Sequence, residues 1–276
     1  DVTETWRETF RRDRNIRDEL DSLWAAAHHF ALAKRHGLAA EAAVTLVERL
    51  FETSGGHPYL AGRFGRRADR ERRHRIYGAL TEASAQLDLA EQQGFDELFN
   101  DEVVAIRIRL LTVRSRFKEV MGDFTEAARN ADMAQQLAKF YGDPTTKLKA
   151  FRAQLEVRYA SGDINAAREG LARLLEILSK ASRPDSLPIY VWLAEAVGRW
   201  EWPGLHGRLF PYLLERVVDL GAHREAIKIC MEWLGSTIQT SDATTVERLV
   251  GETISQAENM GELPYFAEEL ARCAAE

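Results

Sequence analysis

The feature that most constrains the fold is a short sequence motif, called the phrase below, that occurs twice in the chain. MGDFTEAARNADMA begins at Met121, and SGDINAAREGLARL begins 40 residues later, at Ser161. Each phrase has a Gly-Asp pair, an Ala five residues after the Gly, and small or apolar residues nine and twelve residues after it. Self-similarity at a period near 40 residues predicts a chain of stacked repeating units. The same columns recur, in full or in part, after four further glycines: Gly37, Gly78, Gly221 and Gly261.

The stretches between these glycines have the period of amphipathic helices. From Val103 to Val120 the apolar residues step by three and four positions in alternation. Asp101 is placed to cap the start of this helix and Gly122 to end it, and Asp123 then begins the next helix. Two helices joined by a tight turn form a hairpin that cannot bury its apolar face alone, so successive hairpins must stack on one another.

The repeated alanines indicate how closely the paired helices approach. Ala127, Ala131 and Ala134 share one helical face, and small side chains let two helix backbones come together at the short end of the usual range. No segment alternates apolar and polar residues with β-branched content, so we expect no sheet. The pattern therefore predicts an all-α fold, an α-solenoid of antiparallel helix pairs.

Composition excludes several classes of protein. Of the 276 residues, 45% are hydrophobic and 29% are charged, which is ordinary for a globular chain. The formal net charge of −6 disfavours a general nucleic-acid binder. Cys230 and Cys273 are too few and too far apart for a disulfide framework, which favours a reducing, cytoplasmic compartment. No apolar run approaches 18 residues, so no membrane span is expected.

Gly122 to Ala134 and Gly162 to Leu174 resemble the tetratricopeptide repeat family. The match lies in the Gly-Asp-apolar-x-x-Ala turn and the small residues after it. The period exceeds the usual one of about 34 residues, as in the divergent repeats of kinesin light chains and of the sensor regions of large bacterial regulatory ATPases. The resemblance implies a right-handed superhelix with a concave groove, binding of a protein or peptide, and neither catalysis nor a cofactor.

On this basis the whole chain is expected to form one repeat array. Gly78 is placed inside a continuous helix, because the apolar stripe runs through it in phase. The interval of 59 residues before Gly221 leaves open whether that glycine lies within a repeat or between repeats. The chain does not begin with Met, so we expect it to be a piece of a longer protein. The expected parts of the array 1–276 are N-terminal helices over 1–56, an Arg-rich connector over 57–75, the best-matching repeats over 76–181, and divergent repeats with a capping helix over 182–276.

The resemblance also implies a groove. In the family, positions 2, 5 and 9 of each first helix face the concave surface. Four of the six corresponding residues here are cations, which suits an acidic partner bearing carboxylates or phosphates. The alternative is that they form solvated polar faces of amphipathic helices. The six expected partner-binding residues are Arg109, Thr112, Arg116, Lys149, Arg152 and Glu156.

Two further clusters are secondary candidates. The segment from Gly62 to Arg75 holds seven arginines, suited to nucleic acid or an acidic partner, but interleaved acids make a solvated helix face the competing interpretation. An aromatic-rich stretch offers tryptophans for a recognition pocket, with packing at a bend as the alternative. The residues are Arg66, Arg67, Arg70 and Arg73 in the first cluster, and Trp192, Trp200 and Trp202 in the second.

Metal and catalytic motifs are not found. His28 and His29 are adjacent and point about 100° apart on a helix, so they make a poor metal pair. Phosphate loops, nucleophile elbows, zinc-protease motifs and dinucleotide fingerprints are all absent from the sequence.

The sequence therefore predicts a non-catalytic scaffold that binds a protein, a peptide, or another domain of the same polypeptide. Two alternatives remain. The chain is the effector-binding sensor part of a multidomain bacterial signalling or defence ATPase or transcription regulator, with a pocket near the tryptophans; or it is an RNA-binding helical repeat, which its charge disfavours.

Overall fold

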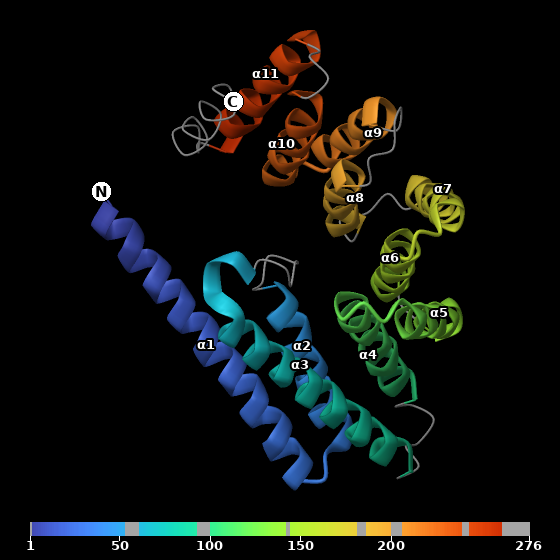
Figure 1. Ribbon diagram of the computed structural model, residues 1–276. Helices are drawn as coiled ribbons and strands as arrows, with labels where there is room; N and C mark the ends of the chain where they lie inside the picture. The colour runs from blue at the N-terminus through green and yellow to red at the C-terminus, as the bar shows by residue number, and fades with distance from the viewer. Residues whose placement is uncertain are drawn as a thin grey trace. The chain divides into compact units, whose positions relative to one another are not determined.

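The computed structural model describes residues 2–52, 61–92, 100–141, 144–180, 186–199, 206–238 and 243–260. These residues form eleven α-helices and no strand, which confirms the predicted all-α class for the described part of the chain. The chain divides into two compact units, Asp1–Leu171 and Ala172–Glu276. The helices, shown in Figure 1, are α1 (Val2–Leu32), α2 (His36–Glu52), α3 (Ala61–Gln92), α4 (Asn100–Val120), α5 (Phe124–Tyr141), α6 (Pro144–Ala160), α7 (Ile164–Lys180), α8 (Leu187–Arg199), α9 (His206–Asp219), α10 (His223–Ile238) and α11 (Ala243–Met260).

Helices of the first unit pack against their neighbours in sequence order. Contacts join α1 to α2, α2 to α3, α3 to α4, α4 to α5 and α5 to α6, and α4 also contacts both α2 and α6. Figure 1 shows α1, α2 and α3 as long helices running side by side. This order of contacts is that of an α-solenoid, in which each hairpin buries its apolar face against the next. The core of α1 to α4 includes the fully buried Leu46, Val47 and Leu87.

Tight turns link several of these helices, and the repeated phrase encodes them. Gly122, Gly162 and Gly221 have φ values of 77°, 82° and 66°, a region that glycine enters without steric cost. After Gly122, the Asp123 amide donates to the Lys118 carbonyl at 2.9 Å, and the Gly122 amide donates to the Glu119 carbonyl at 2.9 Å. These two bonds make a Schellman C-cap, and the same pair of bonds recurs at Gly162 and Gly221.

The aspartates of the phrase begin the next helices. Asp123 Oδ1 accepts a hydrogen bond from the Glu126 amide at 3.3 Å, and Asp163 Oδ1 accepts one from the Ala166 amide at 3.3 Å. Both therefore act as N-caps, as the sequence predicted for Asp123. A hydrogen bond from Lys118, 2.9 Å away, lowers the pKa of Asp123 below its usual range.

The alanine column lies at the helix seams. Ala127, Ala167 and Ala226, each five residues after a turn glycine, are fully buried. The Ser115 hydroxyl of α4 donates to the Ala127 carbonyl of α5 at 2.9 Å, a bond that requires the two helices to lie close together. The phrase is thus a turn followed by a small residue where the second helix crosses the first.

In the repeat that the sequence analysis assigned to Gly37, the turn lies three residues earlier than that glycine. Gly37 lies inside α2, and the left-handed residue of that turn is Lys34, with a φ of 56°. The Arg35 amide donates to the Phe30 carbonyl at 2.8 Å, which completes the same C-cap. Counted from Lys34, the residues five, nine and twelve positions later are Ala39, Ala43 and Leu46, all fully buried.

The remaining boundaries follow from the helices. Gly78 lies within α3, as predicted, and α3 begins at Ala61, so residues 61–75 are helical instead of forming a connector. Gly221 joins α9 to α10, and α8 is the additional helix in the 59-residue interval. The predicted phrase at Gly261 and the predicted capping helix lie outside the described residues.

The second unit has its own core. α10 contacts α8, α9 and α11, and α8 contacts α9. The rings of Phe210 in α9 and Trp233 in α10 stack with centroids 5.6 Å apart and an interplanar angle of 7°. Trp192 of α8 is 2% exposed and belongs to this core.

Candidate functional site

Three polar stripes on successive first helices of the hairpins form the best candidate surface. α4 contacts α2 on one side and α6 on the other. Each helix carries polar residues at spacings of three and four positions, which places them on one helical face. The stripes contain Glu41, Thr45 and Glu48 on α2, Arg109, Thr112 and Arg116 on α4, and Lys149, Arg152 and Glu156 on α6.

Arg109 links two of these stripes. Its Nε and Nη2 atoms donate to the two carboxylate oxygens of Glu48 at 3.1 Å and 2.6 Å, and Nη2 also donates to the Thr45 hydroxyl at 2.9 Å. The Arg109 and Glu48 side chains are only 21% and 23% exposed. Burial acts to lower the pKa of Arg109, but the hydrogen bond and the charge of Glu48 outweigh it and hold that pKa above its ordinary value. Arg109 therefore holds α4 against α2.

The other two predicted residues of α4 are half-buried. The guanidinium of Arg116 lies 4.8 Å from the ring centroid of Phe51 at the end of α2, a cation–π contact. The Thr112 hydroxyl donates to the Ile108 carbonyl within α4 at 2.8 Å. Arg109 and Arg116, at the two ends of the stripe on α4, thus both contact α2.

The three predicted residues of α6 differ in exposure. Arg152 Nε donates to Glu156 at 3.3 Å, one helical turn away, and the Glu156 side chain is 17% exposed. Lys149 is exposed and has no ion pair with any residue that the structure describes. Lys149 is therefore the cation of the six that is best placed to meet a partner.

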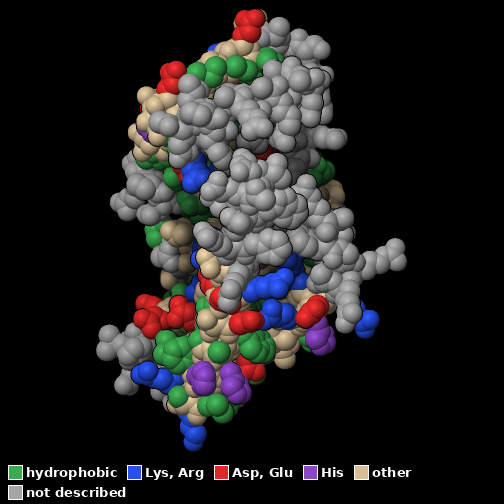
Figure 2. All heavy atoms as spheres, turned by 90° about the vertical axis from the view of Figure 1, so that its left-hand side faces the viewer, with side chains coloured by type: hydrophobic (Ala, Val, Ile, Leu, Met, Phe, Trp, Pro, Cys, Tyr) green, Lys and Arg blue, Asp and Glu red, His purple; other side chains and the backbone are tan. Residues whose placement is uncertain are grey.

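The charge of this surface is mixed. Glu41, Glu48 and Glu156 lie among the four cations, and sequence spacing alone did not reveal that two of these acids lie beside Arg109. Figure 2, which presents another part of the surface, likewise shows acidic and basic side chains next to one another among the residues that it colours by type. A partner would therefore meet individual charges at fixed places instead of a uniform basic patch.

The arginine-rich segment forms the first half of α3. Arg66 and Arg67 lie in the helix, but their side chains fall outside the described set. Arg70 is exposed and Arg73 is half-buried, and neighbouring Arg75 pairs with Asp21 of α1. At its described end the segment is thus a helix face that makes contacts with α1.

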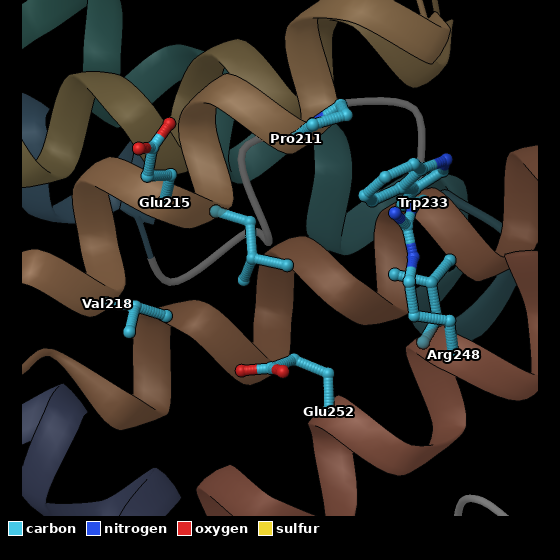
Figure 3. Close-up of a pocket in the computed structure, with 8 residues that line it drawn as sticks. Pro211, Glu215, Val218, Trp233, Arg248 and Glu252 are labelled. Atoms are coloured by element: carbon cyan, nitrogen blue, oxygen red, sulfur yellow. The ribbon is translucent and has the colours of Figure 1, made fainter.

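A hollow in the second unit was not predicted. It has a volume of about 300 Å³ and lies among α9, α10 and α11. Figure 3 shows Trp233 and Arg248 together at one side, with the guanidinium 4.9 Å from the Trp233 ring centroid. Glu215 and Val218 lie on the opposite side, and Glu252 lies below, on the same helix as Arg248. The lining residues are Pro211, Leu214, Glu215, Val218, Trp233, Arg248, Leu249 and Glu252.

Among the tryptophans singled out in the sequence, the structure describes only Trp192, which is not one of the residues that line this hollow. Trp192 is buried in the core, and Trp200 and Trp202 lie outside the described residues. Pro211, which lies inside α9, lines the hollow.

The described residues offer little reactive chemistry. Burial raises the pKa of the Cys230 thiol to about 12, so this thiol stays protonated near neutral pH. Among the residues that the structure covers, no group of three His, Cys, Asp or Glu side chains is placed to hold a metal ion. Within the same part of the chain, every helix is too short or too polar to cross a membrane.

No protein-family model matches the chain, and no curated protein matches it.

Proposed function

We propose that this chain is a non-catalytic interaction module that holds a peptide or helix of a partner along the stripes of α2, α4 and α6. The observation that supports the proposal is that the first helices of successive hairpins contact each other, α2 with α4 and α4 with α6, and that each carries polar residues at helical spacing. Surfaces of this kind, built by stacked hairpins, are the extended binding faces of helical-repeat proteins. We also propose that the protein works in the cytoplasm.

The contacts within the surface suggest how it would work. Arg109 is fixed by Glu48 and Thr45, so it contributes a rigid floor instead of a direct charge contact. A surface that is rigid before binding loses little conformational entropy when the partner docks. Lys149, which is exposed, is then the residue that would pair with a carboxylate of the partner.

The test uses two lysines of the same helix. Lys147 and Lys149 are both exposed on α6, but two positions apart on a helix they point about 200° away from each other. Peptides would be selected against the protein from a random display library, and their affinities measured by fluorescence anisotropy against Lys149→Glu and Lys147→Glu.

We expect the selected peptides to contain an acidic residue and to bind Lys149→Glu roughly tenfold more weakly. Replacing an attraction by a repulsion at an exposed site changes the binding free energy by about 1–2 kcal/mol. Lys147→Glu should stay within about twofold of the native affinity. If the two variants lost affinity equally, or if neither lost affinity, the proposed binding surface of α2, α4 and α6 would be wrong.

A further inference from the structure

Two parts of the chain use the same hydrogen-bond relay. His36 lies two residues after the turn residue Lys34, and its Nδ1 is 2.6 Å from Gln86 Oε1 of α3. The Gln86 amide in turn donates to Glu82, four residues earlier, at 2.9 Å. The same relay occurs in the second unit, at the same distance from the turn residue Gly221. There the distances are 2.6 Å for His223 Nδ1 to Gln256 Oε1 and 2.7 Å for Gln256 Nε2 to Glu252 Oε1.

Burial follows the same register. Residues of α2 and α10 that correspond are 187 positions apart, and those of α3 and α11 are 170 positions apart. The helices α1 to α3 and α9 to α11 are therefore two versions of one three-helix arrangement. Seven buried residues of the first version correspond, in order, to seven buried residues of the second. Those of the first version are Ala39, Ala40, Leu46, Val47, Ala79, Ala83 and Leu87, and those of the second are Ala226, Ile227, Trp233, Leu234, Leu249, Thr253 and Ala257.

When the 187-position offset of α2 and α10 is continued through the preceding turn into α1 and α9, each residue that lines the α9–α11 hollow has a counterpart in α1–α3. Pro211 corresponds to Trp24, and Arg248 corresponds to Gly78. In the first version the indole of Trp24 lies over Gly78, because a Cβ atom on that glycine would be 3.9 Å from Trp24 Cη2. The space beside α3 is thus filled from within the chain by an aromatic ring.

The second version lacks that ring. Pro211 is too small to replace an indole, and the guanidinium of Arg248 lies over Trp233. What remains is the hollow of about 300 Å³, at the place where the first version holds its tryptophan. Trp24 is 43% exposed, so the place is one that an aromatic side chain can reach from solvent.

We propose that the α9–α11 hollow binds the tryptophan side chain of a partner peptide that carries a basic residue next to that tryptophan. Leu214, Val218 and Leu249 supply an apolar wall for the indole. The carboxylates of Glu215 and Glu252 lie at the rim and attract the neighbouring cation. This site belongs to the second unit and does not depend on the surface of α2, α4 and α6.

The probe is the capped peptide Gly-Trp-Lys-Gly carrying 5-fluorotryptophan, titrated with the protein and followed by ¹⁹F NMR. Two companions carry Leu in place of Trp or Glu in place of Lys, with affinity measured by competition. We expect the Leu peptide to bind at least tenfold more weakly and the Glu peptide about threefold to tenfold more weakly. Free tryptamine is the small-molecule comparison, and it should bind more weakly than the peptide.

The decisive variant, called the transplant, places the Trp and Gly of the α1–α3 arrangement at the corresponding positions of α9 and α11. Pro211→Trp combined with Arg248→Gly should seat an indole from within, retain the helical circular dichroism, and abolish binding of the probe. A second pair of variants applies even if the transplant does not fold. Glu215→Gln should weaken the probe about threefold to tenfold, whereas Glu247→Gln, an exposed residue of α11 that does not line the hollow, should leave its affinity unchanged.

Three results would overturn the proposal: no affinity of the native protein for the tryptophan peptide, undiminished affinity in a folded transplant, or equal effects of Glu215→Gln and Glu247→Gln. If tryptamine bound as tightly as the peptide, the proposed ligand would also be wrong, because a small aromatic amine would then suffice. Because the hollow and the surface of α2, α4 and α6 share no residue, Lys149→Glu should leave the probe unaffected.

Discussion

Substitution of Gly170 by Ala tests how closely α7 approaches α6. A Cβ atom on Gly170 would overlap Leu155 Cδ2 and lie 3.5 Å from Leu155 Cγ. Leu155 is 1% exposed, so its displaced methyl group has only the core to move into. The matched control is Gly78→Ala in the interior of α3, where the nearest atom, Trp24 Cη2, is at an ordinary contact distance of 3.9 Å.

The two substitutions share one energy term and differ in another. Replacing Gly by Ala inside a helix stabilises it by about 0.5–1 kcal/mol. Gly78→Ala should show this gain in the free energy of unfolding. At Gly170 the same gain is opposed by overpacking, which costs about 1–3 kcal/mol. The variants should therefore differ by roughly 1–3 kcal/mol, with Gly170→Ala the less stable.

The assay is thermal unfolding followed by circular dichroism. For a unit of this size each 1 kcal/mol corresponds to about 2–4 °C, so Gly170→Ala should melt roughly 2–12 °C below Gly78→Ala. A midpoint for Gly170→Ala equal to or above that of Gly78→Ala would refute the close crossing of α6 and α7.

Two further predictions concern Arg109 and Cys230. A double-mutant cycle with Arg109→Ala and Glu48→Ala, measured by urea unfolding, should give a coupling energy of roughly 1–2 kcal/mol, because the two paired charges are half-buried and doubly hydrogen-bonded. Additive effects of the two changes would mean that the pair does not hold α4 to α2. The Cys230 thiol, with its pKa raised by burial to about 12, should react with iodoacetamide far more slowly than a free thiol between pH 7 and 9, as read by mass spectrometry of its peptide. Since an unfolded thiol ionises near pH 9.0, this group should favour folding fully below that pH and lose its contribution as the pH rises toward 12. Rapid alkylation of native Cys230 that rises with pH like that of a free thiol would contradict its burial.

Much of the fold could be predicted because local rules govern it. The alternating three- and four-residue steps between Val103 and Val120 specify a helix without knowledge of its neighbours. The turns at Gly122 and Gly162 were predictable because a left-handed residue is most often glycine. The turn at Lys34 was missed for the same reason, since a lysine gives no sequence signal for a positive φ.

The candidate surfaces were less predictable because they depend on residues far apart in the chain. Helical spacing grouped Arg109 with Arg116, but the partner of Arg109 is Glu48, 61 residues earlier. The hollow in the second unit depends on how three helices meet and on the small volume of the Pro211 side chain. The equivalence of His36 and His223 emerges only once each is seen bonded to a glutamine on the following helix.

The most direct measurement of partner binding along α2, α4 and α6 is paramagnetic relaxation enhancement. A display-selected peptide carrying a nitroxide label would be added to ¹⁵N-labelled protein. Because the peptide is expected to lie across the three stripes, amide signals of Thr45, Thr112 and Lys149 should broaden together, and more strongly than those of α3 and α5. Broadening confined to α3 or α5, with these three amides unchanged, would contradict the proposed binding face.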